Sequence, residues 1–419
     1  MEPQLTREQI AATTYRWDRV RGAGQGITET CWQVFALLVA IRVFQADESV
    51  KQFIPAGLGV GFLLSPLGLS LFNRLKLPVA TIIAILWSLV AVALFLMCLA
   101  NSIITFVACI AAAQILASQG IPLLTHIYSN NYPSSSRGSR LSTTFVIASS
   151  CGIVFGYLGG RLLDLDERLY PYIFGAGVAA ALLYAWSVRN IPSEPALHLG
   201  SRNPFTCMAI AWKDLLFRRM LIAWMLLGTG SLMLIPIRVE YLANPVYGIN
   251  ASNAEVSLLL ISTVLAFRLL STKLWGGLFD RMNVVTLRIL INSIIMASVI
   301  LFFFTDRLWS IGIGCALLGT AFGGGGILWS LYVTKLAPPD KVAAYMSVHG
   351  STTGLRMALS PFIGYSVVHF THPALAAWIS LCLVSLSTIL FLPLRPLIDA
   401  KAGELEAIPV ASNRPADRA

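Results

Sequence analysis

Ionisable side chains inside long apolar segments are the residues of this sequence best suited to chemistry. Arg268 and Arg356 each lie near the middle of such a segment, and His349 precedes Arg356 by two helical turns. A guanidinium group offers planar, paired hydrogen-bond donors that match a carboxylate, phosphate or sulfate. Because an unpaired charge in an apolar segment is costly, these residues predict a hydrated cavity that binds an anion.

Uncharged side chains in other apolar segments could line the same cavity. Trp32 and Gln33 lie in the first apolar segment, Gln114 in the fourth and Trp329 in the tenth. Each candidate also has a structural interpretation, because buried arginines can bond helix carbonyls and glutamines often join neighbouring helices. The expected substrate-binding residues are Arg268, Arg356, Gln33, Trp32, Gln114, His349 and Trp329.

Carboxylates are placed differently from the arginines. We find no Asp or Glu in the middle third of any apolar segment, and Glu29 falls at the inner end of the first one. A proton-coupled exporter of cationic drugs needs a carboxylate at mid-membrane depth, both to bind the cation and to carry the proton. The pattern therefore favours an anionic organic solute over a cationic one.

The elements that must position these side chains are apolar helices. Apolar residues make up 56% of the 419-residue chain and charged residues only 12%. Soluble proteins carry roughly twice that charge, about 25%. The apolar runs are long enough to cross about 30 Å of hydrocarbon as helices. The composition excludes a soluble enzyme and predicts an all-α polytopic membrane protein with twelve spans, at residues 28–46, 52–73, 78–99, 102–127, 140–163, 168–188, 219–241, 254–279, 284–305, 308–334, 342–369 and 373–394.

Basic residues predict the orientation of these spans. Lys and Arg gather in alternate loops, beginning with the segment before the first span and ending with the tail after the last. Both termini are therefore predicted to be cytoplasmic, in a plasma or inner membrane. The net charge of +10 follows from this topology, so no nucleic-acid partner is expected. The seven cysteines have no metal-binding spacing, and neither a metal nor another cofactor is expected.

The longest polar interruption divides the chain into two halves. Within it, residues 205–217 have the composition of an amphipathic helix on the membrane surface, and residues 5–21 are a second candidate for such a helix. The predicted organisation is a cytoplasmic N-terminal segment at 1–27, a six-helix bundle at 28–189, a cytoplasmic linker at 190–218, a second six-helix bundle at 219–396 and a disordered cytoplasmic tail at 397–419.

A loop motif follows the eighth span. Residues 276–283 read GGLFDRMN and resemble the motif G-x-L-a-D-r-x-g of the major facilitator superfamily. The resemblance implies that Asp280 acts as a latch on the start of span eleven near Val342, where the helix dipole favours an anion. The corresponding first-half copy ends in Asn73 and Arg74, with Leu69 in place of the glycine and Asn73 in place of the aspartate.

A stripe of glycines runs along the fifth span. Residues 152–160 read GIVFGYLGG and resemble the antiporter motif of the superfamily's exporters, except that Tyr157 replaces the expected proline. Close packing of two helices is the structural interpretation of the same stripe. The expected gating and conformational residues are Gly276, Asp280, Arg281, Asn73, Arg74, Gly152, Gly156 and Gly160.

The resemblance to the major facilitator superfamily implies two pseudo-symmetric halves that rock around a central site. It implies a secondary active or facilitative transporter, not an enzyme, that works by alternating access, and the arginines within the apolar segments indicate a small anionic organic solute as its cargo. The expected partners are that solute, a coupling proton or cation and the lipid bilayer, with the chain acting as a monomer. Two alternatives stay open: an exporter of amphipathic or drug-like compounds, and a transporter-like sensor or assembly factor that binds without transporting.

Overall fold

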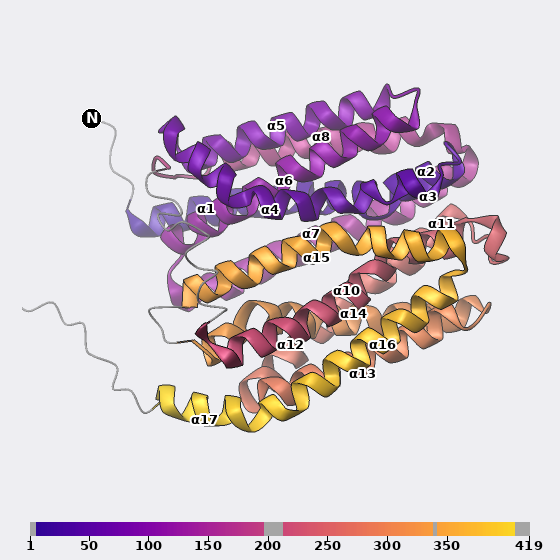
Figure 1. The fold of residues 1–419 in the computed structure, drawn as a ribbon. Helices are drawn as coiled ribbons and strands as arrows, with labels where there is room; N and C mark the ends of the chain where they lie inside the picture. The colour runs from indigo at the N-terminus through magenta and orange to yellow at the C-terminus, as the bar shows by residue number, and fades with distance from the viewer. Residues whose placement is uncertain (1–5, 197–212, 338–341, 407–419) are drawn as a thin grey trace, which may run out of the picture.

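The computed structural model describes residues 6–196, 213–337 and 342–406 of the chain, and these ranges are almost entirely helical. Long helices run side by side in two groups, an N-terminal group drawn in indigo to magenta and a C-terminal group drawn in dark red to yellow (Figure 1). The first and eighth crossings each contain a π-helical turn, η1 and η4. The six crossings of the first half are α1–η1–α2 (Arg7–Thr30, Cys31–Phe35, Ala36–Arg42), α3–α4 (Glu48–Lys51, Phe53–Leu75), α5 (Val79–Cys98), α6 (Ile103–Asn131), α7 (Ser134–Leu165) and α8 (Tyr170–Arg189).

The second half repeats this arrangement with six further crossings. Among the described residues, ten helices of the whole chain are long and apolar enough to cross a membrane on composition alone. The other two, which begin with α1 and with α15, carry polar side chains that face the protein interior. The crossings of the second half are α10 (Leu215–Ala243), α11–η4–α12 (Asn253–Ser257, Leu258–Thr263, Val264–Arg281), α13 (Val284–Phe303), α14 (Leu308–Leu331), α15 (Val342–Phe370) and α16 (Pro373–Phe391).

The two ends of the bundle differ in what they contain. The start of α1 and the C-terminal helix α17 (Arg395–Glu406) lie at the same end (Figure 1), which we call the terminal end. The opposite end, which we call the distal end, holds the short connections after α2, α7 and α10. The halves meet along α4 with α15 and along α7 with α11 and η4.

The first helix begins much earlier than the sequence analysis placed it. Helix α1 starts at Arg7, with the capping box that Thr6 and Gln9 form, and continues without interruption into the first crossing. Its polar residues are buried against α7 and α8 because they satisfy one another. The Asp18 carboxylate accepts hydrogen bonds from Tyr128 at 2.6 Å and from Thr144 at 2.7 Å. The expectation of a surface helix at residues 5–21 is therefore wrong.

The C-terminal end also differs from the expectation. Helix α17 covers Arg395–Glu406, so the first ten residues of the segment predicted to be disordered are helical. The Lys401 ammonium lies 2.9 Å from the Asp214 carboxylate, which caps the start of α10. The surface helix expected at residues 205–217 lies mostly outside the described residues, and its last three residues belong to α10.

Candidate functional site

A cavity of about 280 Å³ lies between the two halves. Its walls come from both groups of helices, including η1, α4 and α6 of the first half and α10, η4, α12, α14 and α15 of the second. A second cavity of about 350 Å³ shares Trp32, Gln33 and Leu58 with the first and extends along α1 as far as Arg21 and Tyr128, toward the terminal end. We call the pair of cavities the central cavity. Both π-helical turns border it, and π-helical turns often occur at functional sites.

Four of the predicted substrate-binding residues line this cavity, namely Arg268, Gln33, Trp32 and Gln114. Arg268 extends from α12 and its side chain is exposed to the cavity. Gln33 extends from η1, is also exposed, and has no hydrogen-bond partner among the described residues. Gln114 has a structural role as well, because its Oε1 accepts a hydrogen bond of 3.0 Å from the Leu58 backbone and so joins α6 to α4.

The other three predicted residues lie elsewhere. Arg356, His349 and Trp329 do not line the central cavity: Arg356 and His349 are buried inside the second half, and the half-buried Trp329 packs against His349. Arg356 donates hydrogen bonds to the Trp224 carbonyl at 3.0 Å and to the Thr353 hydroxyl at 2.9 Å. The expectation that Arg268 and Arg356 share one site is therefore wrong, because the Arg356 side chain points from α15 into its own half.

Glu29 is the main cavity residue that the sequence analysis did not identify as a site. It lines the cavity from α1 and interacts electrostatically with Arg268 of the opposite half. Glu29 lies 13 residues before the end of α2 at Arg42, which is about 20 Å along a helix. The sequence analysis placed Glu29 at the inner end of the first span because it started that span at residue 28, whereas the helix begins at Arg7 and Glu29 lines the cavity.

A chain of hydrogen bonds leads from Glu29 toward the terminal end. Gln25 donates to the Glu29 carboxylate at 2.7 Å, and Arg21 donates to Gln25 at 2.6 Å. Arg21 also donates to the Asp18 carboxylate at 2.6 Å, and both side chains are nearly inaccessible. The spacing of these residues along α1 is the sequence signal that could have revealed a polar, inward-facing stripe.

A second arginine, Arg238, borders the cavity from α10. Its guanidinium carbon lies 5.4 Å from the centre of the Phe302 ring and 5.7 Å from that of Phe303. Its Nε and Nη1 atoms are buried and have no hydrogen-bond partner among the described residues. The described part of the central cavity thus presents three guanidinium groups, those of Arg21, Arg238 and Arg268, and one carboxylate, that of Glu29.

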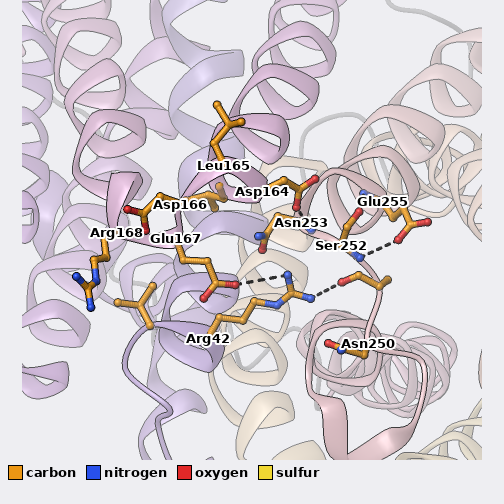
Figure 2. A pocket seen from close by; sticks show the side chains of 13 residues that line it. Arg42, Asp164, Leu165, Asp166, Glu167, Arg168, Asn250, Ser252, Asn253 and Glu255 are labelled. Carbon is orange, nitrogen blue, oxygen red and sulfur yellow. Dashed lines mark hydrogen bonds and ion pairs between the residues drawn. The ribbon is translucent and has the colours of Figure 1, made fainter.

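The distal end is closed by polar contacts between the halves, some of which Figure 2 shows around a surface cleft of about 760 Å³. Arg42 donates to the carbonyl of Ala251 in the opposite half and lies 3.7 Å from Glu167 in its own half. Asp164 at the end of α7 accepts hydrogen bonds from the backbone of Asn253 at 2.7 Å and of Ala254 at 3.2 Å. A carboxylate at this position is stabilised by the N-terminal dipole of the helix that begins with α11.

A buried ion pair adds to this closure. The Lys51 ammonium lies 2.8 Å from the Glu240 carboxylate, which belongs to the opposite half. Lys51 also lies 3.3 Å from Glu48 of its own half. The Lys51–Glu240 pair joins α3 to α10, so it exists only while the halves meet at the distal end.

The glycine stripe of the fifth span lies at this same junction. A Cβ atom on Gly160 would come within 2.8 Å of the Ala254 Cα, and one on Gly156 would come within 3.0 Å of Ile261. A Cβ on Gly152 would lie 3.2 Å from the Thr30 hydroxyl. The close packing that the sequence indicated is thus present, because the glycines let α7 approach the eighth crossing.

The loop-motif residues lie at the terminal end of the second half. Asp280 and Arg281 are exposed at the end of α12, and Asp280 has no partner among the described residues. The expected latch with the start of span eleven adjoins residues 338–341, which lie outside the described residues. Gly276 is loosely packed, because a Cβ atom placed on it would lie 4.0 Å from its nearest neighbour, the Ile327 side chain. In the first-half copy, Arg74 is exposed and Asn73 is half-buried.

A cavity enclosed between two six-helix halves, closed at one end and extended toward the other, is the architecture of a membrane transporter. A sequence profile of the Major Facilitator Superfamily matches residues 22–361. The chain therefore belongs to the Major Facilitator Superfamily. No curated protein matches the chain by sequence.

Solved transporter structures share this fold. A variant of the nucleoside transporter NupG superposes with a TM-score of 0.73 at 13% identity, over 92% of this chain and 99% of that one. A D-xylose–proton symporter gives a TM-score of 0.65 at 15% identity, over 93% and 98% of the two chains. The human organic anion transporter MFSD10 gives 0.59 at 15% identity, over 93% and 100%. At these identities the similarity defines the fold, and the solute must be argued from the cavity.

Proposed function

We propose that the protein is a secondary transporter of a small organic anion, which binds in the central cavity against Arg268. The observation that carries this proposal is the exposed Arg268 guanidinium in a cavity that both halves line. Its fork of donors matches a carboxylate, phosphate or sulfate. Ligand pockets for drug-sized molecules span roughly 300–1,000 Å³, so the part of the cavity around Arg268, about 280 Å³, suits a small solute.

Glu29 couples this binding to a proton in the proposed mechanism. An ionised Glu29 competes with the anion for Arg268, since the two residues already interact across the cavity. A protonated Glu29 releases Arg268 and leaves a net positive charge for the solute. Proton and anion therefore bind together, and binding of either one favours binding of the other.

The direction of opening follows from the basic loops. The terminal end carries the Lys- and Arg-rich loops, so we assign it to the cytoplasm. The described conformation then has its outer side closed by Arg42, Asp164 and the Lys51–Glu240 pair, with the cavity extending inward. Rocking of the halves would break these contacts and expose the same site to the outside.

Solute exchange in proteoliposomes tests the proposal. A thermal-shift screen of organic anions, sugars, amino acids and cationic drugs identifies the probe solute, because a bound ligand stabilises the folded protein. Arg268→Lys keeps the charge but loses the bidentate fork, and we expect it to weaken anion binding by about tenfold or more. Lys273→Gln is the matched control, because Lys273 is an exposed cation on the same helix and does not line the cavity. Equal binding and exchange by Arg268→Lys and the parent would refute the site.

One observation favours a second candidate function, the export of amphipathic compounds. Most of the cavity wall around Arg268 is apolar, with Leu37, Leu232 and Phe322 among its residues. The glycine stripe has a structural explanation as well, because its glycines pack closely against the eighth crossing. Transport assays in inverted vesicles separate the two candidates. If only apolar or cationic compounds stabilise the protein and are transported, the exporter is favoured. A ligand that binds without any counterflow would instead favour a sensor.

A further inference from the structure

The second half contains a group of buried polar side chains that lies apart from the central cavity. It brings together Trp224 of α10, Arg288 of α13, Tyr332 of the short helix η5 (Tyr332–Lys335), and His349 and Arg356 of α15. We call these five residues the arginine–aromatic cluster. All five are at least 95% buried. None of them lines the central cavity.

The cluster concentrates positive charge around one indole ring. The guanidinium carbon of Arg288 lies 5.0 Å from the centre of the Trp224 ring, and that of Arg356 lies 5.8 Å from it. Neither arginine has an ion-pair partner among the described residues, and the partner of the Arg288 Nε is the neutral amide of Asn292 at 2.7 Å. A ring face compensates a cation only in part, and an isolated charge in a protein interior is strongly unfavourable.

The cluster also has more hydrogen-bond donors than acceptors. Five of its buried polar atoms have no partner among the described residues: Trp224 Nε1, Tyr332 Oη, His349 Nδ1 and Nε2, and Arg356 Nε. The Trp and Arg nitrogens can only donate, the tyrosine hydroxyl can donate or accept, and a neutral imidazole supplies one donor and one acceptor. Buried polar atoms are almost always hydrogen-bonded, so this set requires an acceptor that the described residues do not supply.

Three aromatic rings pack around the His349 imidazole, two from the cluster and one from the neighbouring Trp329. The His349 ring centre lies 4.9 Å from that of Tyr332, 5.3 Å from that of Trp224 and 5.4 Å from that of Trp329.

We propose that the arginine–aromatic cluster is a binding site for a small inorganic anion of the size of chloride. The anion accepts hydrogen bonds from the unpartnered donors and compensates the two guanidinium charges. It is a fixed component of the second half, separate from the transported solute, because the cluster is buried away from Arg268. This inference is independent of the proposed transport function.

Anion titration of the purified full-length protein tests the site. The thermal unfolding midpoint is measured in sodium gluconate while chloride or bromide replaces gluconate at constant ionic strength. We expect a saturable rise of the midpoint with either halide, and a bromide anomalous-scattering peak within the cluster in crystals of the parent protein. The absence of that peak at saturating bromide would overturn the proposal, whatever the variants do.

Two tyrosine variants provide a matched comparison. Tyr332→Phe removes one donor from the cluster, and we expect it to weaken the apparent halide affinity roughly tenfold to hundredfold, since hydrogen bonds to ions are strong. Tyr365→Phe is the control, because Tyr365 is equally buried with an unpartnered hydroxyl but is not part of the cluster. Equal halide responses of the two variants would contradict the assignment. Loss of the halide response in Arg268→Gln would place the anion in the central cavity and would also overturn it.

Discussion

Replacement of Lys51 by methionine removes the cation from the ion pair that joins the halves at the distal end. The Lys51 and Glu240 side chains are 2% and 0% exposed, and their charged atoms are 2.8 Å apart. Without Lys51, Glu240 retains one side-chain donor, the amide of Asn244 at 2.7 Å, and its Oε2 atom already lacks a partner among the described residues. A buried carboxylate would thus lose its only cation among the described contacts.

The size of the effect follows from burial. Removal of one partner from a buried ion pair costs about 3–5 kcal/mol, because the other charge stays uncompensated. The cost applies to the conformation that is closed at the distal end, since separation of the halves allows water to reach Glu240. Each 1.4 kcal/mol changes an equilibrium about tenfold, so the balance should move about a hundredfold or more toward the distal-open conformation.

Spin-label distance measurements provide the assay. Labels at Ser49 and Val246 are exposed and lie on opposite halves at the distal end. We expect the Lys51→Met protein to populate a longer distance that is rare in the parent. The double variant Lys51→Met/Glu240→Gln should return most of the population to the short distance, because no unpaired charge remains. An unchanged distance in the single variant would refute the reasoning, and a double variant as open as the single one would show that the buried carboxylate is not the cause.

Three further predictions concern other parts of the molecule. Glu29→Gln imitates the protonated acid, so solute binding should become insensitive to pH while binding itself persists; parallel pH titrations of binding check this, and an unchanged pH profile would exclude Glu29 as the coupling group. Gly160→Leu should obstruct distal closure, because even a Cβ atom at this position would lie 2.8 Å from the Ala254 Cα. A cysteine pair placed across the distal cleft should therefore cross-link more slowly in this variant than in the parent. Burial acts to raise the pKa of Asp214, but hydrogen bonds from Lys401, from the Phe217 backbone and from Tyr345 hold it below its usual value. An ionised Asp214 with a lowered pKa stabilises the folded protein at pH values above the ordinary carboxyl range, and this stabilisation is lost as the pH falls through the lowered pKa. Asp214→Asn removes the titrating group, so hydrogen exchange in α17 should become less sensitive to acid.

Much of the architecture could be predicted from the sequence. Twelve helices, two halves and the division near residue 200 follow from the lengths of the apolar runs and the polar interruption, which are local properties of the chain. The loop motif at residues 276–283 indicated the superfamily because it needs only a short contiguous segment. The glycine stripe at 152–160 indicated close packing, since a missing side chain has the same consequence in any arrangement of helices.

The first helix shows that local hydropathy does not predict the burial of polar residues that have distant partners. A polar stretch is expected to lie in water, yet Asp18 and Arg21 are buried because partners from three other helices satisfy them. Those partners are more than a hundred residues away in the chain, so no window of sequence contains them. The position of Glu29 within the first helix, and with it the presence of a carboxylate in the central cavity, was therefore decided by the tertiary structure.

Arg268 and Arg356 show that the direction of a side chain could not be predicted from the sequence. The sequence by itself determined that Arg268 and Arg356 both lie deep within apolar helices. Only the tertiary structure decided that Arg268 faces the cavity between the halves, whereas Arg356 stacks against Trp224 inside its own half. Successive residues of an α-helix are rotated by about 100°, and in a buried helix nearly every direction is apolar. Hydropathy therefore predicts the depth of a side chain in the membrane, and the packing of the helices determines its direction.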